Sequence, residues 1–328
     1  MNIKGLLLGS AAALAMGASA QAADLPVAAV SACPAGTLDL GDACLTISGS
    51  VTAGVKASYP TTANTTNIGS YASADLSFAA ETETEMGTLS STIGLETADD
   101  LTADAGAQAL NVSSALIQLG GFVAGYGTTL AAAGEDYSTV MVGYNGDVAG
   151  LSYSLGLESQ QAANNVDGMP TVAAALGYDV NDMFSVSTSA IYKTIKESDD
   201  DANTGLFAVA ASATVTPVDA LSLTLGGAYY STALAYSDTN IGANGLTAAA
   251  NYDAATAWDI YASASYDVTD TVALGLSADY NFQETLGVTA SSTWTPVTGF
   301  SVTTEVDYTS SVGVESTTDY LIEVSRSF

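Results

Sequence analysis

Carboxylates are the side chains in this sequence that could do the most chemistry. The chain has 35 Asp and Glu residues against 5 Lys and Arg residues, and its formal net charge is −30. Glu305 and Asp307 are alternate residues of one segment, and two carboxylates can act as general acid and general base in glycoside hydrolysis. The surrounding sequence does not indicate the cleft that such a pair needs. We therefore do not expect this pair to be catalytic.

The absence of histidine limits the remaining chemistry. With no His in the chain, a Ser-His-Asp or Cys-His centre, a His general base and a His-ligated zinc site are all excluded. Nucleic-acid binding requires clustered Lys and Arg, which the sequence lacks. The sequence predicts neither an enzyme nor a nucleic-acid-binding protein, and we expect no cofactor and no dedicated metal site.

A second group of acids is crowded into segments that are predicted to be loops. Such acids could bind divalent cations that bridge the protein to anionic lipopolysaccharide. No twelve-residue calcium loop with its Gly and terminal Glu is present, and runs of charge are usually solvated. We favour solvated loop acids and keep divalent-cation binding as an alternative. These acids are Asp99, Asp100, Asp104, Asp199, Asp200 and Asp201.

The N-terminus predicts export. Residues 1–22 contain one basic residue, Lys4, an apolar stretch over residues 5–18 and the small residues of Ala20-Gln21-Ala22. This is the pattern of a secretory signal peptide cleaved after Ala22. No later segment approaches 18 uninterrupted apolar residues, so any membrane span of the mature chain must be a β-strand.

The two cysteines lie early in the mature chain. Cys33 and Cys44 enclose a short loop, and in an oxidising periplasm a disulfide is the default for such a pair. We expect residues 23–43 to form an N-terminal periplasmic segment held by this bond. Residues 44–328 then form the folded domain.

The folded domain alternates between apolar and small or polar residues with a period of two, which indicates β-strands with two different faces. Near the start of this domain, Ile47 and Val51 share one face, while Thr46 and Ser50 share the other. Helical spacing fits these segments less well. We expect sixteen strands, near residues 44–59, 69–82, 87–96, 110–119, 121–128, 138–145, 149–158, 170–179, 183–195, 205–216, 220–231, 256–268, 270–283, 286–295, 299–309 and 318–328.

The connections between these strands alternate in length. Tight turns alternate with longer acidic segments, as the short periplasmic turns and longer external loops of outer-membrane barrels do. The sequence therefore predicts an all-β fold, a transmembrane antiparallel β-barrel of about sixteen strands. The tight turns are expected at residues 85–86, 119–121, 145–147, 181–182, 217–219, 269 and 296–299.

The composition of the polar face favours a membrane barrel over a soluble β-protein. Charged residues are only 12% of the chain, and Ser, Thr, Gly and Ala fill the positions where a soluble sheet would expose Lys and Glu. Aromatic residues lie on the apolar faces near strand ends, where amphipathic rings settle at the membrane interfaces. These residues are Tyr59, Trp258, Tyr266, Tyr280, Trp294, Phe300, Tyr308, Tyr320 and Phe328.

Five segments have a distinctive sequence, namely residues 1–14, 44–49, 115–122, 142–156 and 324–328. Together they resemble the alphaproteobacterial porins of Rhizobiales. The resemblance follows the whole chain in order. It implies a sixteen-stranded, trimeric porin of the Gram-negative outer membrane, in which loop 3 narrows the pore. It also implies that the terminal Phe328 is the signal read by the barrel-assembly machinery.

The constriction departs from this family pattern. In the family, loop 3 faces a wall that carries arginines, whereas the only Arg here is Arg326, near the expected periplasmic end. The loop between Gly127 and Ser138 is short and carries Glu135 and Asp136. We expect these two acids at the loop 3 constriction, without an arginine wall opposite them.

The strand phase places a set of charged residues on the face that would line the lumen. A charge in the lipid-facing band is unfavourable near the bilayer midplane, by about 2–4 kcal/mol for Lys and by less for Asp and Glu, which supports this placement. Lumen acids raise the local cation concentration and repel anions. The sequence predicts a water-filled, cation-selective pore for small hydrophilic solutes. The expected pore-lining residues are Lys56, Asp75, Glu96, Glu158, Asp259, Asp279, Glu305, Asp307 and Glu323, with Lys193 as a second cation.

Two other functions remain open. A secreted surface-layer or adhesive protein has a similar composition, but it predicts internal repeats that the sequence does not show. A barrel with a closed lumen could anchor or join parts of the envelope through its loops. For the channel interpretation, the expected partners are outer-membrane lipid, lipopolysaccharide, the assembly machinery and two further copies of the chain.

Overall fold

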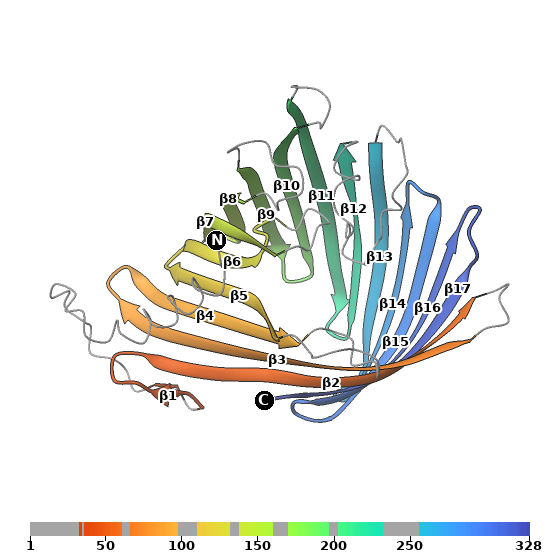
Figure 1. The fold of residues 1–328 in the computed structure, drawn as a ribbon, viewed down its shortest axis with the longest axis horizontal. Helices are drawn as coiled ribbons and strands as arrows, with labels where there is room; N and C mark the ends of the chain where they lie inside the picture. Colours follow the sequence, from red (N-terminus) through yellow and green to blue (C-terminus); the bar gives the residue numbers. More distant parts are fainter. Residues whose placement is uncertain are drawn as a thin grey trace.

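The chain forms a closed antiparallel β-barrel in a computed structural model (Figure 1). The structure describes residues 33–34, 36–60, 66–97, 110–131, 138–159, 170–196, 203–231 and 256–328. Within these ranges no helix is long and apolar enough to cross a membrane. The expected signal peptide, residues 1–22, lies outside the described residues, as do the six loop acids considered as cation ligands.

Sixteen of the 17 strands in the sheet form the ring, and the seventeenth, β1, lies outside it. Each ring strand pairs with its neighbours in the sequence, and β17 pairs with β2 to close the ring. The predicted number of strands is confirmed. The strands are β1 (Leu38–Asp39), β2 (Cys44–Pro60), β3 (Asn67–Thr84), β4 (Gly87–Thr97), β5 (Leu110–Leu119), β6 (Phe122–Thr128), β7 (Ser138–Val148), β8 (Leu151–Glu158), β9 (Thr171–Asn181), β10 (Phe184–Lys196), β11 (Asn203–Val218), β12 (Leu221–Ser231), β13 (Thr256–Thr269), β14 (Val272–Asn281), β15 (Thr285–Val297), β16 (Phe300–Ser311) and β17 (Thr317–Ser327).

The alternation of connection lengths is also present. At the end of the barrel where β2 begins and β17 ends, neighbouring strands are joined by two-residue turns. The connections at the opposite end are longer, as the barrel prediction requires. The two-residue turns are residues 85–86, 120–121, 149–150, 182–183, 219–220, 270–271 and 298–299.

The turn between β7 and β8 was placed wrongly by the sequence. It was expected at residues 145–147, but the two strands continue to pair there, and the chain reverses at Ala149 and Gly150, which have φ of 50° and 82°. The Tyr153 ring lies across Gly146, where a Cβ would come within 2.6 Å of the Tyr153 Cζ atom. Gly146 therefore makes room for a cross-strand ring rather than making a turn.

The outer face of the barrel is apolar. In β2, Val51, Val55 and Tyr59 alternate with inward-facing residues, and Val55 is 49% exposed. In the neighbouring β17, Tyr320 and Ile322 continue this face, and the rings of Tyr59 and Tyr320 meet edge to face at 5.5 Å between centroids. Large apolar side chains exposed on one face of every strand match a lipid-facing surface.

Aromatic pairs lie near both ends of this outer face. Near the end with longer connections, ring centroids are 5.9 Å apart for Trp258 and Tyr280. Near the two-residue turns, the rings of Tyr144 and Tyr153 stack with centroids 6.2 Å apart. Aromatic rings in two bands are typical of the interfaces of a membrane barrel.

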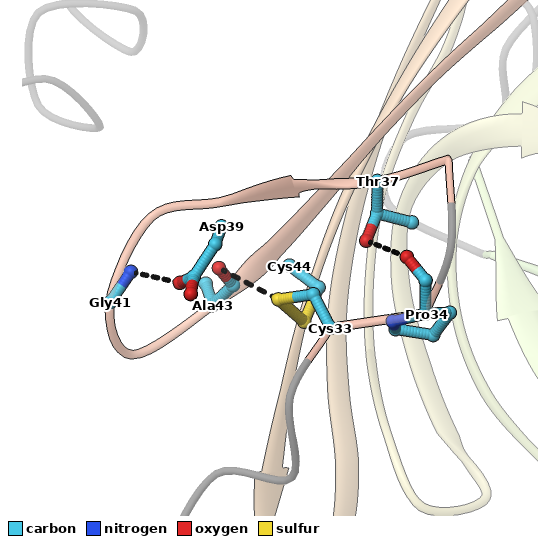
Figure 2. The surroundings of a disulfide bond; sticks show 7 residues. All are labelled: Cys33, Pro34, Thr37, Asp39, Gly41, Ala43 and Cys44. Atoms are coloured by element: carbon cyan, nitrogen blue, oxygen red, sulfur yellow. Dashed lines mark hydrogen bonds between the residues drawn. A yellow bond between two sulfur atoms is a disulfide. The ribbon is translucent and has the colours of Figure 1, made fainter.

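The short strand β1 and a disulfide cover the start of β2 (Figure 2). Cys33 and Cys44 are bonded, with their Cα atoms 5.5 Å apart, which confirms the expected pairing. Strand β17 pairs with β2 only as far as Ser50, and Phe328 exchanges two backbone hydrogen bonds with Gly49. Beyond that point, β1 pairs with β2 at Cys44 and Leu45. The disulfide therefore holds β1 on an edge of β2 that β17 leaves uncovered.

Replacing both cysteines with serine should release β1 without opening the barrel. The disulfide joins residues 11 positions apart, and loop-closure estimates give such a bond about 3 kcal/mol. The barrel ladder does not include it. We expect the Cys33→Ser, Cys44→Ser variant to keep the heat-modifiable gel migration of a folded barrel, while proteases cleave the chain before residue 44 more readily. Loss of the folded band would contradict this.

Candidate functional site: the barrel lumen

The lumen is lined by the faces that point away from the apolar outer surface. On β2 these positions include Ser50, Thr52, Gly54 and Lys56, and pairing carries the same face to every other strand. By this register, all nine residues predicted to line the pore lie on the inner face of the barrel. Their burial and contacts differ widely, so each group is described in turn.

The first group of inner acids lies on β3 and β4. Asp75 and Glu96 are directly opposite each other across the two strands. Ser50 of β2 donates a hydrogen bond of 3.1 Å to the Asp75 carboxylate. Like charges placed directly opposite each other destabilise a sheet. The fold therefore accepts an unfavourable pair at this position of the inner wall.

The second group lies on β16 and β17. Asp307 is directly opposite Asp319, a second pair of facing carboxylates. Lys56 of β2 forms an ion pair with Asp319, at 2.8 Å between Nζ and Oδ2. Thr289 of β15 donates a hydrogen bond of 2.6 Å to Asp307. Asp319 was not among the predicted lumen residues, although it shares the alternation of Glu323.

Glu323 and Glu305 extend this group along the same two strands. Tyr71 of β3 donates a hydrogen bond from its hydroxyl group to Glu323. To reach it, the Tyr71 ring lies across Gly54 of β2, where a Cβ would come within 2.6 Å of the ring. The Glu305 carboxyl lies within electrostatic range of Asp307, Glu323 and Lys56.

These two groups occupy adjacent strands, and we call them the acidic wall. The wall runs over β16, β17, β2, β3 and β4, which are consecutive in the ring. Lys56 is the only cationic side chain on the described part of the inner face. The wall consists of Asp75, Glu96, Glu305, Asp307, Asp319 and Glu323, with Lys56.

Two further predicted acids lie on the neighbouring strands β13 and β14. Asp259 accepts a hydrogen bond of 2.9 Å from the Ala228 backbone N–H and one of 3.4 Å from the Tyr230 hydroxyl. Asp279 lies directly opposite Tyr261 and extends over Gly287 of β15. No group of three or more acidic or cysteine side chains within the described ranges is arranged to hold a metal ion.

The chain turns into the lumen directly after β6. Ala131 is 0% exposed and packs in a buried cluster with residues of β9 to β12. Leu130 packs against the same cluster. The other members of the cluster are Ala173, Ile191, Ala208, Ala228 and Tyr230.

Glu158 contacts this inward segment and not open lumen. Its side chain points inward from β8, but it is 1% exposed. Its Oε1 atom accepts hydrogen bonds of 2.8 Å from the Thr129 hydroxyl and 2.7 Å from the Leu130 backbone N–H. Glu158 was expected among the residues that line the water-filled pore. The structure instead buries it because the chain after β6 covers it.

Three predicted residues lie outside the part of the structure that can be described. Glu135 and Asp136, expected at the constriction, fall in residues 132–137. The side chain of Lys193 is likewise outside the described set. The inward turn of the chain is therefore defined by residues 129–131.

The acidic wall and the inward segment lie on opposite sides of the ring. In a ring of sixteen strands, β17, β2, β3 and β4 are each eight strands from β9, β10, β11 and β12. The first set carries most of the acidic wall, and the second set carries the cluster beneath Ala131. A solute passing through the lumen would have the acids on one side and the inward segment on the other.

Thr129, Leu130 and Tyr71 lie in the lumen but were not among the residues predicted to line it. One signal was present for the first two, because four inner positions on β9, β11 and β12 are alanines, namely Ala173, Ala208, Ala210 and Ala228. Apolar residues on a face that should line water indicate that protein covers them. Tyr71 shares the alternation of Asp75, which indicates an inward face, but its contact with Glu323 depends on Gly54 of the neighbouring strand.

Comparison with known proteins agrees with this geometry. Residues 40–324 match the porin subfamily. None of the curated proteins matches the chain. Among solved structures, the outer membrane channel DcaP of Acinetobacter baumannii is similar with a TM-score of 0.70 and 14% identity, over 90% of this chain and 100% of that one.

Two other solved structures share the fold. OmpF of Salmonella typhi, in complex with daunomycin, has a TM-score of 0.63 and 14% identity, over 89% of this chain and 100% of that one. A mutant porin of Rh. blastica has a TM-score of 0.55 and 15% identity, over 87% of this chain and 100% of that one. The inward segment, the closed sixteen-strand ring and the match over residues 40–324 lead to one conclusion: this chain is a member of the porin subfamily, an outer-membrane β-barrel channel of the Gram-negative type.

Proposed function

We propose that the channel is cation-selective and passes small hydrophilic solutes by passive diffusion. The observation that carries this proposal is the acidic wall. Its six carboxylates face Lys56 as the only cation among the described inner side chains, and Lys56 is already paired with Asp319. Acids on a wall backed by lipid raise the concentration of cations in the lumen and lower that of anions.

The directly opposed carboxylates indicate that the acidic wall serves a function, because they do not help the barrel to fold. Asp75 with Glu96, and Asp307 with Asp319, are directly opposite each other in the sheet. Such pairs disfavour folding, so a sequence selected for stability alone would place serine or threonine at one position of each pair. A cation in the lumen relieves the repulsion, and this links the pairs to cation passage. The proposal assigns transport and no catalytic role.

The proposal extends to assembly. We infer a homotrimer of the alphaproteobacterial type in the outer membrane, embedded beside lipopolysaccharide, with Phe328 as the residue read by the assembly machinery. Phe328 directly follows β17, the strand that closes the ring, and its backbone forms two hydrogen bonds with Gly49. Its side chain is 62% exposed in the closed barrel, which leaves it accessible to a partner protein.

Neutralising the acidic wall should reduce cation preference. In the Glu305→Gln, Asp307→Asn, Glu323→Gln variant, three charges leave the lumen while the polar groups that accept from Thr289 and Tyr71 remain. We expect the reversal potential in a potassium chloride gradient across a planar bilayer to move toward zero. Raising the salt should move the wild type the same way, because the screening length falls from about 10 Å at 0.1 M to about 3 Å at 1 M.

The matched control removes three acids from the two-residue turns. Asp182, Asp219 and Asp270 are exposed at the end of the barrel with the two-residue turns. Their replacement by asparagine changes the net charge equally and should leave the reversal potential close to that of the wild type. An anion-preferring wild type would refute the proposal. A folded barrel that passes no ions would favour an adhesive or structural role.

Removing the lumen cation should have the opposite effect. Lys56→Gln releases Asp319 from its ion pair, so the wall gains one uncompensated negative charge. We expect a stronger preference for potassium over chloride in the same measurement. Arg326→Gln is the control, because Arg326 lies on the outer face and donates to the Thr298 carbonyl. Equal shifts in both variants would mean that net charge, not lumen charge, sets selectivity.

A further inference from the structure

The point where the chain enters the lumen is built by three separate features of the inner wall. The first is a seat of alanines on β9, β11 and β12, bordered by Ile191 and Tyr230, in which Ala173 and Ala208 are 0% exposed in the cluster with Ala131. Serine or threonine at these positions would need a hydrogen-bond partner once covered. Alanine needs none, so the seat accepts a backbone segment closely.

The second feature is a notch for Leu130. Gly143 of β7 and Gly156 of β8 are directly opposite each other on the inner face. A Cβ atom at either position would collide with the Leu130 side chain. The two glycines therefore leave a space that the Leu130 side chain fills.

The third feature is the carboxylate of Glu158. Both the Thr129 hydroxyl and the Leu130 backbone N–H donate to the same oxygen, Oε1. Burying a carboxylate is unfavourable unless hydrogen bonds compensate for the lost water. The position of Glu158 and the inward position of residues 129–130 therefore depend on each other.

We propose that Glu158 is a positioning residue that fixes where the chain enters the lumen, and so sets the bore of the channel, and that it takes no part in ion selectivity. Leu130, held between Gly143 and Gly156, fixes the direction in which residues 129–131 run. Glu158 fixes their position along the barrel axis. This inference goes beyond cation selectivity and holds whichever ion the channel prefers.

The position of the segment can be measured without ion flow. The chain has 2 cysteines, and both are in the disulfide, so Ala131→Cys would carry the only free thiol. Because Ala131 is 0% exposed, we expect this thiol to react slowly with a membrane-impermeant maleimide. Adding Glu158→Met removes the acceptor at similar volume and should raise the rate roughly tenfold for each lost bond to the charged group.

Glu158→Gln separates the positioning role from a charge role. The glutamine Oε1 atom can accept both hydrogen bonds while the charge is removed. We expect the Ala131→Cys thiol to stay protected in this background. A thiol that is equally protected with Glu158→Met and with Glu158→Gln would overturn the proposal.

Channel recordings in the chain without the reporter cysteine give a second test. We expect Glu158→Gln to keep the conductance and reversal potential of the wild type, and Glu158→Met to raise the single-channel conductance with the reversal potential unchanged. If Glu158→Gln instead shifts the reversal potential as far as Glu305→Gln does, Glu158 is a selectivity residue and the proposal is wrong. If the wild type is not cation-selective, the conductances of the Glu158→Gln and Glu158→Met variants still test the positioning role of Glu158.

Filling the notch should have the same effect as removing the anchor. Gly156→Ala places a Cβ against Leu130 and 2.9 Å from the Val142 carbonyl oxygen, so Leu130 must move. Gly275→Ala is the matched control, because its Cβ would meet only the Ser291 side chain. We expect faster labelling of the Ala131→Cys thiol with Gly156→Ala and no change with Gly275→Ala. Each variant must first show the heat-modifiable gel migration of a folded barrel. Unchanged labelling with Gly156→Ala would contradict the role of the notch.

Discussion

The hydrogen-bond ladder that closes between β17 and β2 is the constraint on which the rest of the structure depends. In hydrocarbon no backbone N–H or C=O can be left without a partner, so a sheet can cross a membrane only if it has no edge. The ladder runs from Thr317 opposite Pro60 to Ser327 opposite Ser50, and Phe328 completes it at Gly49. Strand β2 begins five residues earlier, at Cys44, and the disulfide and β1 cover its edge at Cys44 and Leu45.

Closure divides the side chains into two populations with opposite requirements. The outer positions face lipid and are filled by Val, Leu, Ile and aromatic residues, so the apolar residues that a soluble protein would bury are exposed. The inner positions are left for polar groups, and this is where an acidic chain can keep its charges in contact with water. Opposed acids such as Asp75 and Glu96 are tolerated because the ladder, rather than their side chains, holds the strands together.

The lumen is not uniform, and small residues determine what occupies it. Gly54 lets the Tyr71 ring cross β2 to Glu323, Gly143 and Gly156 receive Leu130, and alanines on β9, β11 and β12 pack against Ala131. The acidic wall lies half a ring away from this seat. One side of the lumen therefore carries charge, while the other side is covered by the chain itself, and Glu158 belongs to the covered side although it is an acid on the same face.

The sequence by itself determined the class of fold, the strands and the face of each residue, because a period of two is a local property and lipid allows only one assignment of apolar and polar faces. It also indicated the Cys33–Cys44 bond, since export and a short spacing suffice. The turn expected at residues 145–147 was wrong, because Gly146 indicates a turn in the sequence but accommodates the ring of Tyr153 from the next strand in the structure. Only the tertiary structure decided which inner acids meet water. Glu158 and Glu323 both point inward and have the same chemistry, but a segment after β6 covers the first and a tyrosine from β3 holds the second. Local periodicity does not show which distant residue meets which acid.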